Sequence, residues 1–207
     1  MNKVFALLIL AFAFAPALRA QEAGHEYAPI QEKTVNYKNW TFTDLKDNKP
    51  VDLRSLAKGK KLVMVVYFAP WCGNWKNEAP VAARLYEKYK AQGLEVIGVG
   101  EYGSRDDVSK YFGPAGPPYP VVMESEGREA RETTSHYGYR QLTGDTRRWG
   151  SPWNIFLEPA RLKATGETVT EKAWVVNGEL IEAEADKFIG EQLKTKTAAI
   201  VPCTPEP

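Results

Sequence analysis

The sequence contains few residues that carry metal or redox chemistry, and this scarcity excludes several classes of function. Its 207 residues include only two cysteines and two histidines. No Cys/His cluster has the spacing of a zinc site, and no glycine-rich phosphate loop is present. Lysine and arginine number 27 against 26 for aspartate and glutamate, so no basic excess suggests a nucleic-acid partner. We therefore expect no cofactor, no metal and no nucleic acid.

The sequence also lacks an apolar run long enough to span a membrane. The run 4–15 is about 12 residues long, whereas a spanning helix needs roughly 20. It follows the cationic Lys3 and is followed by small residues at Ala17 and Ala20, as in a secretory signal peptide. Removal of residues 1–20 would change the formal net charge from +1 to about −1. We expect a periplasmic or secreted protein without stable membrane insertion, the alternative being an uncleaved anchor.

Between two polar ends, the sequence predicts one α/β domain. Residues 21–37 form a polar N-terminal arm and residues 195–207 a Pro-rich C-terminal tail, both loosely ordered. In residues 38–194, strands alternate with helices, which favours a central mixed sheet flanked by helices. The expected elements are a hairpin at 40–51, strands at 62–68, 94–99, 119–123, 154–157 and 173–176, and helices at 53–57, 74–92, 105–112, 133–141 and 182–194.

The chemistry is concentrated around one cysteine at a predicted strand-to-helix junction. Residues 67–80 read Y-F-A-P-W-C-G-N-W-K-N-E-A-P, with the cysteine at Cys72. This segment resembles the TlpA-like (redoxin) branch of the thioredoxin-fold proteins, whose motif is F-x-A-x-W-C-x-x-C-x-x-E-x-P. The resemblance covers roughly residues 38–192. It implies a thioredoxin-like fold in which the segments 124–148 and 158–172 are insertions.

One position departs from this motif, because Trp75 stands where the family has its second cysteine. In the family, the first cysteine attacks a disulfide and the second resolves the mixed disulfide, so a dithiol cycle within the motif is impossible here. Cys72 still lies at a predicted helix N-terminus, where backbone N–H groups favour the thiolate that attacks in disulfide exchange. The alternative is a relic cysteine, inert or held in a disulfide.

The other thiol, Cys203, lies in the Pro-rich tail. Residues 195–203 would span roughly 30 Å if extended, which is long enough to fold back. Three alternatives are open: Cys203 resolves Cys72, bridges it permanently, or stays free. A permanent bridge would close a long loop and stabilise the fold by about 4 to 5 kcal/mol.

Further site residues are implied by the resemblance. Pro152 matches the family's cis-proline, and the backbone of Ser151 before it would contact substrate beside Cys72, unless the turn is purely architectural. Glu78 matches the motif glutamate, which lies near the redox site and influences thiol protonation. A plain solvated helix residue is the alternative for Glu78.

Aromatic residues are dense around the same two segments. The tryptophans close in sequence to Cys72 or Pro152 are Trp71, Trp75, Trp149 and Trp153. Such residues favour interfaces, and we expect them to line an apolar groove for a polypeptide. Alternatively, they pack together and plug the site. The histidines, His25 and His136, are expected at the surface.

The sequence is consistent with two main functions. The first is a thiol-disulfide oxidoreductase or isomerase that uses Cys72 by a monothiol route on a polypeptide client or electron donor. The second is a non-catalytic thioredoxin-fold binding module. A thiol peroxidase is a weaker alternative, because the peroxiredoxin pattern has Thr or Ser three residues before its cysteine, where this chain has Ala69.

Overall fold

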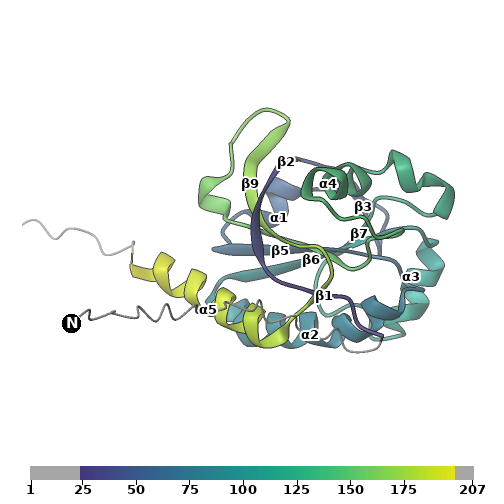
Figure 1. Ribbon diagram of the computed structural model, residues 1–207, viewed down its shortest axis with the longest axis horizontal. Helices are drawn as coiled ribbons and strands as arrows, with labels where there is room; N and C mark the ends of the chain where they lie inside the picture. The colour runs from purple at the N-terminus through teal and green to yellow at the C-terminus, as the bar shows by residue number, and fades with distance from the viewer. Residues whose placement is uncertain (1–23, 199–207) are drawn as a thin grey trace, which may run out of the picture.

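The computed structural model describes residues 24–198, so the signal-like segment 1–20 and Cys203 lie outside the described residues. An eight-stranded mixed sheet forms the centre of the domain, in the order β2-β9-β8-β5-β6-β7-β3-β4 (Figure 1). A separate parallel pair joins β1 to β10. The strands are β1 (Tyr27–Ala28), β2 (Gln31–Lys38), β3 (Thr41–Asp44), β4 (Pro50–Asp52), β5 (Leu62–Phe68), β6 (Leu94–Gly100), β7 (Val121–Met123), β8 (Trp153–Leu157), β9 (Thr168–Val176) and β10 (Glu179–Leu180).

Helices cover both faces of the sheet, as Figure 1 shows, with α2 and α5 on one side and α1 and α4 on the other. Together with the strands they make the thioredoxin-like α/β fold that the sequence predicted. Among the helices of residues 24–198, none combines the length and the apolar character needed to cross a bilayer. The helices are α1 (Leu53–Ala57), α2 (Gly73–Tyr89), α3 (Arg105–Phe112), α4 (Ser135–Thr143) and α5 (Glu182–Ala198), with 3-10 turns at Lys90–Gln92, Arg128–Thr133 and Pro159–Arg161.

The position of β5 at the centre of the sheet explains why its sequence is apolar without interruption. It pairs in parallel with β6 and antiparallel with β8, and every one of its side chains is buried. Met64 and Val66 join the core under α2 and α5, whereas Val63 and Val65 join the core on the opposite face. Both faces of such a strand are covered, so its apolar residues do not alternate with polar ones, and the sequence reads as a continuous apolar run.

The N-terminal arm differs from the prediction. Residues assigned to a loose polar arm form β1 and β2, and β2 pairs antiparallel with β9 along the edge of the main sheet. Only Val35 and Tyr37 of β2 are buried, so most of this edge strand is polar and its period-2 pattern is weak. The partner strand β9 begins at Thr168, inside the segment 158–172 that resembled an insertion.

The last helix also differs from the prediction. Helix α5 continues to Ala198, past the expected end at 194. No glycine or proline follows residue 194 until Pro202, so the sequence contains no local stop at the position where the helix was expected to end. The tail that carries Cys203 is therefore shorter than expected.

Candidate functional site

Cys72 lies where β5 gives way to α2. It is the N-cap residue of α2, with extended backbone (φ −76°, ψ 129°), and its side chain does not cap the helix. The half-buried thiol Sγ instead donates a hydrogen bond of 3.1 Å to the backbone oxygen of Ser151. The Ser151–Pro152 peptide bond is cis. The cysteine motif and the proline loop, which the sequence predicted to form one site, therefore meet at the thiol.

Two hydrogen bonds hold the proline loop against the thiol. Ser151 Oγ accepts a 2.9 Å bond from the backbone N–H of Ala69, at the end of β5. Arg147 Nη2 donates to the backbone oxygen of Pro152 at 2.8 Å. Ser151 is only 3% exposed, and its hydroxyl is bound within the protein by the backbone of Ala69. Its backbone oxygen faces Cys72.

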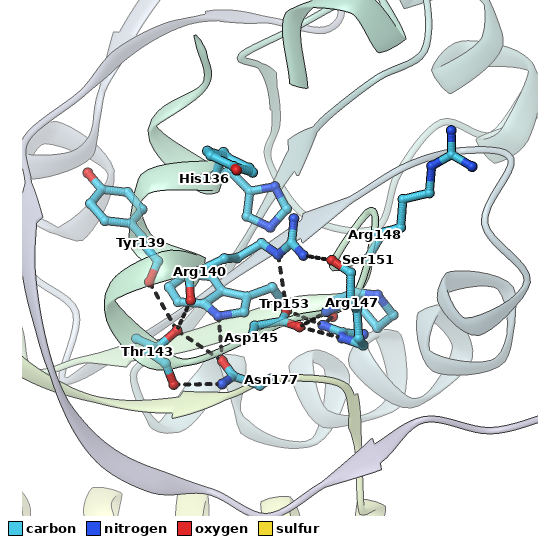
Figure 2. A network of polar contacts seen from close by, with 12 residues as sticks. His136, Tyr139, Arg140, Thr143, Asp145, Arg147, Arg148, Ser151, Trp153 and Asn177 are labelled. Carbon is cyan, nitrogen blue, oxygen red and sulfur yellow. Dashed lines mark hydrogen bonds and ion pairs between the residues drawn. The ribbon is translucent and has the colours of Figure 1, made fainter. Parts of the chain in front are cut away.

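A buried ion network lies behind this loop (Figure 2). Asp145 Oδ2 is 3.1 Å from Arg140 Nε and 2.8 Å from Arg147 Nη2, and Arg140 and Asp145 are both almost fully buried. Burial alone would raise the pKa of Asp145, but the hydrogen bond from Arg147 and the charges of both arginines lower it. The ionised carboxylate thus joins α4 to the loop that carries Pro152.

Two of the four predicted tryptophans flank the thiol. Trp71 and Trp149 are half-buried and meet edge to face, with ring centroids 5.2 Å apart. The indole Nε1 of Trp71 donates to the backbone oxygen of Tyr102 at 2.8 Å, which fixes the ring. Trp71 precedes Cys72 directly and Trp149 lies shortly before Ser151, so these two rings border the exposed side of the site.

The other two tryptophans do not line a groove. Trp75 is fully buried under α2, where it stacks on Phe68 with ring centroids 4.4 Å apart. Trp153 is fully buried on the opposite face of the sheet, where it donates to Asn177 Oδ1 at 2.8 Å. The prediction of one four-tryptophan groove was wrong, because α2 turns position 75 inward and β8 turns position 153 to the far face.

Glu78 is neither solvated nor able to touch a client at the surface. It is 1% exposed, and its Oε2 accepts from the backbone N–H of Leu180 at 2.6 Å and from Asn154 Nδ2 at 3.2 Å. Burial raises the pKa of Glu78 to about 8, against the opposing effect of these two hydrogen bonds. At neutral pH this carboxyl is mostly protonated.

One of the two histidines was predicted at the wrong depth. His136 is fully buried, with its ring stacked on Tyr67 and its Nδ1 3.0 Å from the hydroxyl of Tyr102. Burial and then the charges of Arg140 and Arg147 hold its pKa well below the usual value. The helical spacing of positions 136, 139, 140 and 143 is the signal that would have placed it inside. His25 is part-buried, with Nδ1 2.8 Å from Glu179 Oε2.

The fold and the site define a class: a thioredoxin-fold protein with one thiol beside a cis-proline. The Redoxin family model matches residues 30–156, and the chain belongs to this family. The match begins next to β2, in agreement with the place of that strand in the sheet. Within residues 24–198, no group of His, Cys, Asp and Glu side chains converges as a metal site would require.

Similar proteins include both oxidoreductases and a peroxiredoxin. Thiol-disulfide oxidoreductase ResA of Bacillus subtilis is 31% identical over 80 residues, which is 39% of this chain and 44% of that protein. The chain thus spans less than half of that relative. Chloroplastic peroxiredoxin Q of Triticum aestivum is 30% identical over 190 residues, 89% of this chain and 76% of that protein. The structure of a thiol:disulfide interchange protein from Chlorobium tepidum shares the fold, with a TM-score of 0.53, 22% identity, and coverage of 83% of this chain and 99% of that one.

Proposed function

We propose that this protein is an exported thiol-disulfide oxidoreductase or isomerase that acts on polypeptides through Cys72 alone. The observation that carries the proposal is the half-exposed Sγ of Cys72, 3.1 Å from the carbonyl that precedes cis-Pro152, at the N-terminus of α2. The similarity to thiol-disulfide oxidoreductases supports the same chemistry. Export is supported by the signal-like pattern of residues 1–20.

The proposed reaction needs one thiol of this chain. The Cys72 thiolate attacks one sulfur of a client disulfide, so that a Cys72–client disulfide forms and the other client sulfur leaves as a thiolate that takes up a proton. In isomerisation, a second client thiolate then attacks the client sulfur of the mixed disulfide, which forms a new client disulfide and releases Cys72. No net oxidation occurs in that cycle. In net reduction, an external thiol attacks the Cys72 sulfur of the mixed disulfide and releases the second client thiol, and a second external thiol then frees Cys72 as the external disulfide forms.

The position of Trp75 supports the monothiol route. This fully buried ring fills the space one helical turn from Cys72, so the helix offers no second sulfur at that point.

The direction of α5 supports an external resolving thiol in place of Cys203. Arg84 pairs with Glu182 and Lys88 with Asp186, so α5 runs parallel to α2 and leads away from Cys72. With a rise of 1.5 Å per residue, its last residue lies on the order of 40 Å from Cys72. The five residues from 199 to 203 span at most about 18 Å. An intrachain bridge would therefore require α5 to unwind.

Trapping the mixed disulfide tests the proposal. The reduced mature protein is incubated with a peptide that contains one disulfide. The reaction is quenched with acid, and the mass of the intact protein is measured by mass spectrometry. We expect a Cys72–peptide adduct that reduced glutathione releases, and none when Cys72→Ser is combined with Cys203→Ser, which removes both thiols. Cys203→Ser is the matched control and should form the adduct at the parent rate. If folded, reduced protein forms no adduct, the proposal is wrong.

The similarity to peroxiredoxin Q gives a second candidate, a thiol peroxidase. The residue three positions before Cys72 is Ala69, which offers no hydroxyl to a peroxide, so we place this function second. Hydrogen peroxide replaces the peptide in the same assay, and dimedone traps the sulfenic acid that peroxide forms at the thiol. Sulfenic acid formation much faster than adduct formation would favour the peroxidase.

A further inference from the structure

Three arginines of the segment 124–148 gather on the two tryptophans that border the thiol. The guanidinium carbon of Arg128 lies 4.1 Å from the ring centroid of Trp71 and 5.7 Å from that of Trp149. Arg131 and Arg148 lie over Trp149 at 5.6 and 5.4 Å. These five residues form what we call the arginine–tryptophan surface. Trp149 and the three arginines line a hollow of about 280 Å³, together with Glu129 and Glu132.

The charge of this surface is only partly neutralised. Arg131 is paired with Glu132. In the part of the chain that the structure describes, neither Arg128 nor Arg148 has a carboxylate within ion-pair distance, although both are exposed. Glu129 is the remaining acid at the hollow and does not pair with either of them. A positive excess therefore remains beside the thiol.

The geometry of the arginines suits carboxylates. A guanidinium stacked over an aromatic ring keeps the N–H groups at its edge free for hydrogen bonds, and that edge matches the two oxygens of a carboxylate. Stacking also restricts the long side chain before a ligand arrives, which lowers the entropy cost of binding. Trp71 immediately precedes Cys72, so the arginine–tryptophan surface begins at the residue next to the thiol, where it can meet residues that neighbour a client sulfur.

We propose that the arginine–tryptophan surface selects polypeptide clients with acidic residues next to the reacting cysteine. The proposal rests on the proposed function, since it names the substrate class of the same thiol. Carboxylates of the client pair with Arg128 and Arg148 while its disulfide approaches Cys72. In this way the segment 124–148, which resembled an insertion, determines specificity.

Two peptides of equal length test the proposal. Each has one cysteine joined by a disulfide to 2-thiopyridine, flanked by two glutamates in one peptide and by two glutamines in the other. Attack of Cys72 on the peptide sulfur releases thiopyridone, which absorbs light and reports the rate. We expect the glutamate peptide to react about fivefold faster at low salt, with the ratio falling as salt is added, because exposed charges are screened.

Substitution of the two arginines tests whether this surface causes the preference for the glutamate peptide. Arg128→Gln with Arg148→Gln should bring the ratio of the two rates close to one. Lys58→Gln with Lys187→Gln is the matched control, because it removes two exposed charges, on α5 and at the end of α1, without altering this surface. That control should keep the fivefold ratio. Equal rates for both peptides with the parent protein would overturn the proposal while the exchange function stands.

A binding measurement separates failure of the proposal from failure of the function. Cys72→Ser protein is titrated with the same peptides in which serine replaces cysteine, and tryptophan fluorescence reports binding at Trp71 and Trp149. Tighter binding of the glutamate peptide, lost with the arginine variants, supports the surface even if no exchange occurs. No preference between the peptides overturns it.

Discussion

The buried carboxyl of Glu78 makes the stability of the protein depend on pH. Its folded pKa of about 8 lies above the 4.5 of a free glutamate, so between these values the folded state keeps a proton that the unfolded state releases. The stability contributed by this group is complete below about pH 4.5. It is lost as the pH rises toward 8, with a slope of about 1.4 kcal/mol per pH unit.

Glu78→Gln should remove this dependence. The glutamine oxygen can accept the hydrogen bonds from Leu180 and Asn154, and its amide group takes the place of the protonated oxygen. From pH 5.5 to 7.5 the parent should lose about 2 to 3 kcal/mol through this one group. The stability of the variant relative to the parent should therefore rise by that amount over the same range.

Urea unfolding at several pH values, followed by tryptophan fluorescence, measures this difference. Glu101 is another buried carboxyl whose pKa burial raises, but it is present in both proteins and cancels in the comparison. Glu87→Gln removes an exposed carboxylate from the same helix and controls for the loss of a charge. If the difference between Glu78→Gln and the parent stays constant with pH, the assignment of a buried, protonated Glu78 is wrong.

Three further substitutions test the site. Asp145→Ala should cost about 3 to 5 kcal/mol in urea unfolding, because it leaves Arg140 buried without its carboxylate; a loss below 1 kcal/mol would contradict the network. Gly150→Ala would place a Cβ in steric clash with Arg140 Nε at φ +57°, and should lower both the melting temperature and the rate of adduct formation. Gly166→Ala, at φ +82° in open space, is its control and should leave that rate unchanged. Trp75→Cys should form a disulfide with Cys72, which mass spectrometry detects. Loss of the buried ring should lower the free energy of unfolding by about 3 to 5 kcal/mol. A folded variant without the disulfide would show that the site geometry differs from that of a dithiol motif.

Features that depend on neighbouring residues were determined by the sequence. Strand β5 is buried on both faces, so its sequence is an unbroken apolar run. Helix α2 is buried along one stripe, so its apolar residues recur every three or four positions. The motif around Cys72 then placed the thiol at the junction of these elements. The same resemblance marked Pro152, although 79 positions separate Ser151 from Cys72.

The burial of individual side chains and the pairing of the edge strand were decided by the tertiary structure. A glutamate in the first turns of a helix is usually solvated, and only the approach of β8 and β10 buries Glu78 and raises its pKa. The polar edge strand β2 likewise becomes recognisable through its pairing with β9. In both cases the partners lie far away in sequence, so no local period records them.

The two groups of tryptophans separate for the same reason. Trp71 and Trp149 meet because the fold brings the start of α2 to the proline loop, and the arginines stack on them because the segment 124–148 folds back over the site. Trp153 is as close to Pro152 in sequence as Trp71 is to Cys72, yet the alternation of β8 turns it to the opposite face of the sheet. The sequence by itself determined which residues surround the thiol along the chain, and the packing of the sheet decided which of them face it.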